Sequence, residues 1–260
     1  MILRRLGNKK KLAKEIQKYF PVHSIYIEPF FGAGGMFFNK PKAKYNIVND
    51  LDSDVFNLFQ VVMNRKEELK EAFYLMPIHS DLLEYWKKNK EEEPIKKALR
   101  FLLLSNFTFN GQGFWLLFGA SNSSSGYMNN FNRILDEAFS FIQGVQFINK
   151  DFRDFFKSIM LDNRGNKKES DKAFIYCDPP YLSTTNNYQN GFTKEDFNDL
   201  ISTLKNTGCK FAISEFLSPF IEAQAEAEGL NLIKIKDRKN LKNRRTEVLL
   251  TNYKQENLLF

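Results

Sequence analysis

Four consecutive residues carry the most distinctive chemistry of this chain of 260 residues, namely Asp178-Pro179-Pro180-Tyr181. The carboxylate of Asp178 can accept hydrogen bonds, and so can the carbonyl of Pro179, which has no internal partner in a turn. Tyr181 offers an aromatic face for stacking, which enzymes that act on flipped-out bases require. The set therefore suits a flat base that carries an exocyclic amine. The alternative is an ordinary strand-end turn with a solvated acid and a core tyrosine.

The run that precedes this tetrapeptide, residues 173–177, is apolar and favours β-structure. Such a run is typical of a buried strand in a parallel sheet. Prolines cannot continue a central strand, so the chain must turn after Cys177. Asp178 and Tyr181 are therefore expected at the carboxyl end of a strand, where open α/β folds bind their ligands.

A second strand, over residues 25–30, leads into the turn Phe31-Gly32-Ala33-Gly34-Gly35 and then into a predicted helix. Strand, glycine-rich turn and helix together let a nucleotide-like ligand approach bare backbone. The turn lacks the lysine and hydroxyl of a phosphate-binding loop. It also lacks the third glycine of the dinucleotide fingerprint, which disfavours a nicotinamide-dependent oxidoreductase.

Asp50 follows the next predicted strand, over residues 45–48. An acid at the end of the second strand of such a unit can bind both hydroxyls of a ribose. The alternative is an N-cap of the helix whose apolar spacing begins at Val55. Because Asp52, Ser53 and Asp54 are better placed to cap that helix, we favour the ribose role for Asp50.

Residues 55–142 are mainly helical and charged, with helices predicted over 81–89 and 94–104. Asn-Gly punctuation flanked by aromatic residues indicates a hairpin or projecting loop near 106–130. The remaining predicted elements are a helix after residue 9 that ends before Pro21, strands over 145–148, 210–214, 232–235 and 247–251, helices over 193–204 (N-cap Thr193) and 219–228, and loops over 162–171 and 183–191.

The formal net charge of +7 and the sequence pI near 9.2 favour a polyanionic partner. The basic run 236–245 is either a solvated hairpin or a phosphate-contacting segment.

Cys177 and Cys209 are expected as buried thiols in a reducing compartment. The two histidines have no ligand-spaced neighbours, so no metal is expected. No membrane-spanning run and no secretory segment is recognised, which predicts a cytoplasmic protein.

The order of these blocks resembles the Dam-type DNA adenine-specific methyltransferases with a DPPY motif. The blocks are Gly7-Asn8-Lys9, Glu28-Pro29-Phe30-Phe31-Gly32-Ala33-Gly34, Asp50, the helical insert, Asp178-Pro179-Pro180-Tyr181 and Glu247-Val248-Leu249-Leu250-Thr251-Asn252-Tyr253. The resemblance implies an α/β, Rossmann-like methyltransferase fold that uses S-adenosyl-L-methionine (AdoMet), with a seven-stranded, mostly parallel sheet and a reversed final hairpin. It also implies a catalytic domain over 1–54 and 143–260, with a helical target recognition domain inserted over 55–142.

The same resemblance implies roles for individual residues. Asp178, Pro179, Pro180 and Tyr181 would be catalytic, facing the flipped adenine. The cofactor would contact Arg5, Lys9, Glu28, Phe30, Phe31, Gly32, Ala33, Gly34, Asp50, Asp151, Phe152 and Asp178. Double-stranded DNA would contact Asn110, Gln112, Tyr188, Lys242, Arg244 and Arg245. A cognate restriction endonuclease is a further expected partner.

At two places the sequence departs from the family pattern, which limits how far the properties of the family can be assigned to this chain. Arg5 stands where many relatives have an aromatic residue, which replaces a π system with a charge. Residues 110–119 contain no arginine, whereas members that recognise GATC have an arginine-rich run after their Asn-Gly pair. Arginine bidentate to guanine is the commonest specific base contact, so GATC specificity is not expected.

Three alternatives remain at this point. The same chemistry could serve the exocyclic amine of cytosine, or adenine in RNA. A protein of another class could keep the fold as an inactive DNA-binding shell, although the intact Asp178, Tyr181, Gly34 and Asp50 argue against it.

Overall fold

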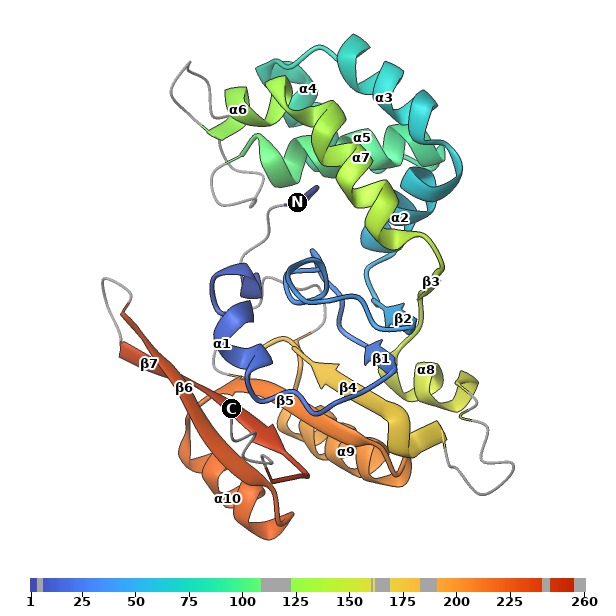
Figure 1. Ribbon diagram of the computed structural model, residues 1–260. Coiled ribbons are helices and arrows are strands. Elements are labelled where there is room, and N and C mark those ends of the chain that lie inside the picture. The colour runs from blue at the N-terminus through green and yellow to red at the C-terminus, as the bar shows by residue number, and fades with distance from the viewer. Residues whose placement is uncertain are drawn as a thin grey trace. The chain divides into compact units, whose positions relative to one another are not determined.

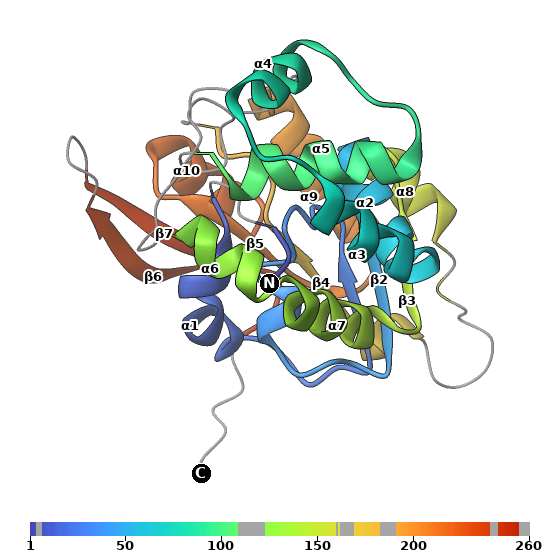
Figure 2. The same ribbon diagram turned by 90° about the horizontal axis from the view of Figure 1, so that it is seen from above.

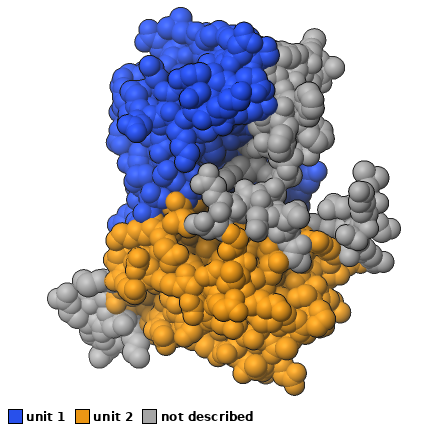
Figure 3. Space-filling model, turned by 180° about the vertical axis from the view of Figure 1, so that it is seen from behind, with its two compact units in different colours: residues 1–11, 32–39, 52–149 blue, residues 12–31, 40–51, 150–260 orange. Residues whose placement is uncertain are grey.

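The computed structural model describes residues 1–3, 7–108, 123–159, 161, 169–182, 191–239 and 244–254. The chain forms two compact units, coloured separately in Figure 3. Unit 1 comprises residues 1–11, 32–39 and 52–149, and unit 2 comprises residues 12–31, 40–51 and 150–260. The predicted domain division at residues 54 and 143 stays a prediction.

Seven strands form one sheet in the order β3-β2-β1-β4-β5-β7-β6 (Figure 1). They are β1 (Ile25–Glu28), β2 (Tyr45–Asn49), β3 (Val145–Ile148), β4 (Ala173–Cys177), β5 (Lys210–Phe216), β6 (Asn231–Lys239) and β7 (Arg244–Thr251). β1 runs parallel to β2 and β4, and β4 runs parallel to β5. β7 is antiparallel to both of its neighbours, β5 and β6. The predicted mostly parallel sheet with a reversed final hairpin is confirmed.

The central strands of unit 2 are buried throughout, as their continuous apolar sequences require. Every residue of β1 and of β4 is buried. Phe20 packs its ring 4.5 Å from that of Phe174 and 5.4 Å from that of Tyr176. Aromatic residues thus supply much of this core, and both cysteines are buried as free thiols.

The helices of unit 2 are α1 (Ala13–Gln17), α8 (Phe152–Ser158), α9 (Lys194–Asn206) and α10 (Pro219–Ala227). Thr193 caps α9 in a reciprocal capping box with Asp196, which fixes where the helix begins and confirms the predicted cap. Both ribbon views show β6 and β7 extending beyond the rest of the sheet (Figures 1 and 2).

Unit 1 contains the helices α2 (Ser53–Asn64), α3 (Lys66–Leu75), α4 (Ser80–Lys88), α5 (Pro94–Asn106), α6 (Ser123–Asn129) and α7 (Phe131–Ile142). Phe73 of α3 stacks on Phe131 of α7 with ring centroids 3.6 Å apart. The carbonyl of Ile2 accepts hydrogen bonds from Nδ2 of Asn106 at 3.1 Å and from the hydroxyl of Tyr127 at 2.9 Å. The first residues of the chain are therefore anchored among the helices of this unit.

One sequence-based expectation was wrong. The helix expected after Gly35 is only a 3-10 turn, Phe37–Asn39, because Pro41 cannot continue a helix and disfavours helical backbone at the residue before it. The hairpin expected near 106–130 stays a prediction, because residues 109–122 lie outside the described residues; the end of that range, Ser123–Asn129, forms α6.

Candidate active site

Three carboxylates stand at or just beyond the carboxyl ends of three adjacent strands of unit 2. Glu28 is the last residue of β1, Asp50 directly follows β2, and Asp178 directly follows β4. The register aligns Ile27 of β1 with Ile175 of β4, and Glu28 with Val48 of β2. The parallel pairing therefore brings the ends of these three strands to one edge of the sheet, as the sequence predicts.

Glu28 is buried, with 2% of its surface exposed. The pKa of its carboxyl is raised to about 8, chiefly by burial and in smaller part by the charges of Asp178 and Asp50. A hydrogen bond of 2.8 Å from the hydroxyl of Tyr26, together with the charge of Lys40, opposes this shift in pKa. Glu28 is therefore largely protonated at neutral pH, so the sheet edge does not carry three full negative charges.

Lys40 accompanies this cluster. Its Nζ lies 3.8 Å from the centroid of the Tyr26 ring, a cation–π distance. Burial lowers the pKa of Lys40 to about 8, and the charge of Glu28 opposes the shift. Sequence reasoning did not identify Lys40 or Tyr26, because neither lies in a recognised motif.

Tyr181 is held by residues of the two strands beyond β4. Its hydroxyl donates a hydrogen bond to Oε1 of Glu247 in β7. Its ring meets that of Phe216, the last residue of β5, edge to face at 4.6 Å. Glu215 accepts a hydrogen bond of 2.8 Å from the backbone N–H of Phe216 and a longer one, 3.4 Å, from that of Leu182.

Three phenylalanines group beside the end of β1 in unit 2. The ring of Phe30 lies 5.7 Å from that of Phe152 and 5.9 Å from that of Phe192. Asp151 caps α8 by accepting a hydrogen bond of 2.9 Å from the backbone N–H of Arg153. The guanidinium of Arg153 lies over the ring of Phe152, at 4.4 Å from its centroid. The structure thus brings Phe30, Phe152 and the capping acid Asp151 together, and adds Phe192, which the sequence analysis missed.

In unit 1, the glycine turn packs against the Gly7-Asn8-Lys9 block. Gly32 and Gly34 have φ values of 54° and 70°, which favour glycine. A Cβ at Gly35 would overlap Oδ1 of Asn8 and lie 2.8 Å from the backbone nitrogen of Lys9. Lys9 itself is buried, and its Nζ donates a hydrogen bond of 3.3 Å to the carbonyl of Gly7. Two blocks that are separated in sequence therefore form one close-packed backbone surface.

The N-cap of α2 is Asp52, whose carboxylate accepts a hydrogen bond of 2.9 Å from the N–H of Asp54. Asp52, and not Asp50, is therefore the cap of this helix, while the ligand-binding role of Asp50 stays a prediction.

Several predicted site residues lie outside the described part of the chain: Arg5, Asn110, Gln112, Tyr188 and Lys242. Arg244 is described only as the first residue of β7. The guanidinium of Arg245 lies 5.3 Å from the ring centroid of Phe216.

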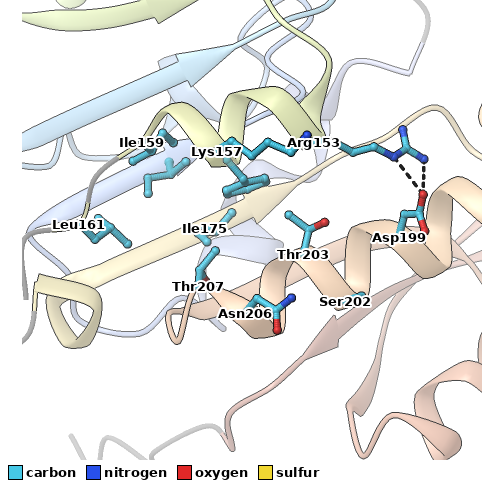
Figure 4. A pocket seen from close by; sticks show the side chains of 12 residues that line it. Arg153, Lys157, Ile159, Leu161, Ile175, Asp199, Ser202, Thr203, Asn206 and Thr207 are labelled. Atoms are coloured by element: carbon cyan, nitrogen blue, oxygen red, sulfur yellow. Dashed lines mark hydrogen bonds and ion pairs between the residues drawn. The ribbon is translucent and has the colours of Figure 1, made fainter.

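A separate pocket of about 570 Å³ lies in unit 2 between α8 and α9 (Figure 4). Ile27 and Ile175 of the sheet form part of its lining. Arg153 of α8 and Asp199 of α9 also line it, and Arg153 donates hydrogen bonds of 2.9 and 2.7 Å to Asp199. Among the residues that the structure describes, none of those predicted to be catalytic or cofactor-binding lines this pocket.

The strand order, the reversed β7 and the acids at the carboxyl ends of β1, β2 and β4 define a Rossmann-like methyltransferase fold. A family model described as D12 class N6 adenine-specific DNA methyltransferase matches residues 6–247, and the chain belongs to this family. Membership implies transfer of a methyl group from AdoMet to the N6 amine of adenine in DNA. The resemblance seen in the sequence is confirmed.

Three curated relatives are each named DNA adenine methylase. That of Escherichia coli K12 is 29% identical over 205 residues, which cover 74% of this chain and 71% of the relative. That of Serratia marcescens is 30% identical over 197 residues, covering 72% and 69%. That of Vibrio cholerae O1 is 27% identical over 230 residues, covering 83% and 79%.

None of the helices that the structure describes combines the length and the apolar character needed to cross a membrane. Within the same residues, no group of three or more His, Cys, Asp or Glu is arranged to hold a metal ion.

Proposed function

We propose that this protein methylates an adenine rotated out of duplex DNA, and that the corner formed by Asp178, Pro179, Pro180 and Tyr181 holds that base. Asp178 and the carbonyl of Pro179 accept the two hydrogens of the N6 amine, and Tyr181 stacks on the ring. The observation that carries the proposal is the position of Asp178. It leaves β4 beside the end of β1, close enough to Glu28 to raise the pKa of that carboxyl.

The obstacle to methylation is the amine itself, because its lone pair is delocalised into the adenine ring. Accepting both amine hydrogens favours a pyramidal nitrogen whose lone pair is localised. Asp178 need not be a strong base, since the amine proton becomes acidic only as the new bond forms. Positioning supplies the rest, and well-oriented groups can contribute up to about 7–11 kcal/mol to lowering a barrier.

AdoMet, when bound, supplies a methyl group that is already activated on a sulfonium. The residues present fit such a ligand: carboxylates at the sheet edge suit its cationic and hydroxyl groups, and aromatic rings suit its adenine. In unit 2 the proposed contacts are Glu28, Phe30, Phe31, Asp50, Asp151, Phe152 and Asp178. In unit 1 they are Lys9, Gly32, Ala33 and Gly34, which continue the chain directly after Phe31; Arg5 completes the set.

Within that set, Asp50 would accept hydrogen bonds from the ribose hydroxyls, and Lys9 would contact the methionine end. The packing of Gly35 on Asn8 and Lys9 supports a shared role for the glycine turn and the N-terminal block. The cluster of Phe30, Phe152 and Phe192 supports placing the adenine of the cofactor beside α8.

The recognition of DNA belongs to the same proposal. The helical segment 55–142 would read the target sequence, with Asn110 and Gln112 contributing contacts. Tyr188, Lys242, Arg244 and Arg245 would add contacts from the catalytic side. The formal charge of +7 supports a polyanionic substrate. A cognate restriction endonuclease stays a prediction, as does a cytoplasmic location.

Replacement of Asp178 by alanine tests the catalytic corner. We expect D178A to lose tritium transfer from labelled AdoMet to unmethylated genomic DNA, while AdoMet binding measured by calorimetry largely survives. D171A is the matched control, because Asp171 is an exposed acid just before the other end of β4 and should leave the rate unchanged. Normal turnover by D178A would overturn the proposal.

A further inference from the structure

Glu247 is an unusual residue for its place in the sheet. It lies in β7 next to Val248, Leu249 and Leu250, and like them it has 0% of its surface exposed. Burying a carboxylate is costly unless hydrogen bonds compensate it. Sequence reasoning treated it only as the first residue of an apolar closing block, so its role must be sought in what it contacts.

One contact of Glu247 is with Tyr181 of the proposed catalytic corner. The hydroxyl of Tyr181 donates a hydrogen bond to its Oε1. Burial raises the pKa of Tyr181 well above its usual range, and the charges of Asp178 and Glu247 add to the shift. The hydroxyl therefore stays protonated and remains the donor. A hydrogen bond to a charged acceptor is among the stronger ones that proteins form.

A second contact restrains the ring itself. Phe216 meets Tyr181 edge to face, with an interplanar angle of 88°. In the antiparallel register, Phe216 of β5 is the direct partner of Glu247 of β7. The paired residues Glu247 and Phe216 thus contact the two parts of the Tyr181 side chain: Glu247 binds its hydroxyl, and Phe216 packs against its ring.

We propose that Glu247 is a positioning residue for methyl transfer, which acts by holding the ring of Tyr181 in the orientation that stacks on the flipped adenine. The inference rests on the proposed stacking role of Tyr181. Tyr181 follows two prolines at the end of a strand, so its backbone is already restrained. Glu247 and Phe216 then restrict the remaining side-chain torsions, and the base meets a ring that needs no reordering.

The inference gives the reversed strand β7 a function in the chemistry. Because β7 is antiparallel to β5, its first residues lie at the same edge as the carboxyl ends of the parallel strands. A parallel strand in this place would put its last residues there instead. The reversed hairpin therefore delivers Glu247 to the corner from the start of a strand.

A double-mutant cycle with E247A and Y181F tests this role, using tritium transfer from labelled AdoMet to unmethylated genomic DNA. Each single variant should slow transfer about 10-fold or more, the worth of one charge-assisted hydrogen bond. The double variant should be no slower than the slower single variant, because both changes remove the same bond. Losses that multiply in the double variant would overturn the proposal.

E247Q separates positioning from folding, because glutamine keeps the size and one acceptor oxygen. We expect it to retain a rate within about threefold of wild type, consistent with a neutral hydrogen bond replacing a charged one. The loss in E247A should fall on kcat, with the Kd for AdoMet unchanged. A rate for E247Q as low as that of E247A, or an unchanged rate for E247A, would contradict the inference. E226Q, which alters an exposed acid on α10, is the matched control.

Y181A keeps this test distinct from the proposed function. Stacking on an aromatic ring is worth roughly 1–3 kcal/mol per base, so Y181A should be at least about fivefold slower than Y181F. Equal rates for Y181A and Y181F would refute the stacking role itself. If Y181A is slower than Y181F, but the fold-losses of E247A and Y181F multiply in the double variant, only the role of Glu247 would be refuted.

Discussion

At the scale of single residues, the site depends on how the fold sets the charge of its acids. Glu28, Asp50 and Asp178 gather at one edge, and like charges that lie close together cannot all ionise cheaply. Burial selects Glu28 as the residue that keeps its proton, with a pKa of about 8. Asp178 is only partly buried, and it is the carboxylate that we propose accepts hydrogen bonds from the base.

The pKa of Glu28 predicts how stability depends on pH. The folded state holds a proton that the unfolded chain releases above pH 4.5, so protonation stabilises the fold at low pH. This contribution falls as pH rises from about 4.5 to about 8 and is lost above that window. E28Q keeps an acceptor for the hydroxyl of Tyr26 but removes the titration. As pH rises through this window, the free energy of unfolding of E28Q should therefore increase relative to that of wild type by up to ~1.4 kcal/mol per pH unit.

Urea unfolding of both proteins at pH 5, 6.5 and 8 provides the measurement. The difference between their free energies of unfolding should change steadily in favour of E28Q. A difference that stays constant with pH would show that Glu28 does not titrate with a raised pKa.

At the scale of elements, the sequence predicts the strands well because their apolar runs are long and end at prolines, glycines and acids. β4 is an example, since Pro179 and Pro180 end it and Asp178 begins the site. The helix expected after Gly35 was wrong because the effect of Pro41 outweighed the local pattern. The roles that we propose for Glu247 and Phe216 could not be predicted from the sequence, because they depend on the antiparallel register that places β7 beside β5.

Arg153 links α8 to α9 in unit 2, and we expect its replacement to weaken cofactor binding. Its guanidinium pairs with Asp196 and Asp199 of α9, at 2.6 and 2.7 Å, and covers the ring of Phe152. R153A should raise the Kd for AdoMet about two- to fivefold, because a cation–π contact that orders Phe152 is worth ~0.5–1 kcal/mol. The free energy of unfolding should fall by no more than about 1 kcal/mol, as is usual for partly exposed ion pairs.

Calorimetric titration of AdoMet into R153A checks this effect, with K157A of the same helix as the control. R153K should restore the Kd only in part, since lysine keeps the charge but cannot reproduce the forked pairing. An AdoMet Kd equal to that of wild type in R153A would mean that Phe152 is not part of the cofactor site.

At the scale of the whole molecule, the residues that we propose as functional belong to both compact units. Lys9 and the glycine turn belong to unit 1, together with the helices, whereas Asp50, Asp178 and Tyr181 belong to unit 2. The chain's excess of basic residues, 38 against 31 acids, suits the phosphates of DNA.

Arg245 provides the test of that electrostatic contact within the described residues. It lies in β7 two residues before Glu247, and it covers the ring of Phe216. If it contacts a phosphate, R245A should weaken DNA binding equally for all sequences and reduce the slope of log K against log salt by about 1.

R245K should restore the slope, because lysine keeps the charge. K14A, which removes an exposed lysine of α1, should leave the slope unchanged. Fluorescence anisotropy with a labelled duplex between 50 and 200 mM salt, roughly the range over which phosphate contacts are resolved, measures these slopes. A slope for R245A equal to that of wild type would assign Arg245 to packing on Phe216 alone, and would leave the hairpin without a phosphate contact at this position.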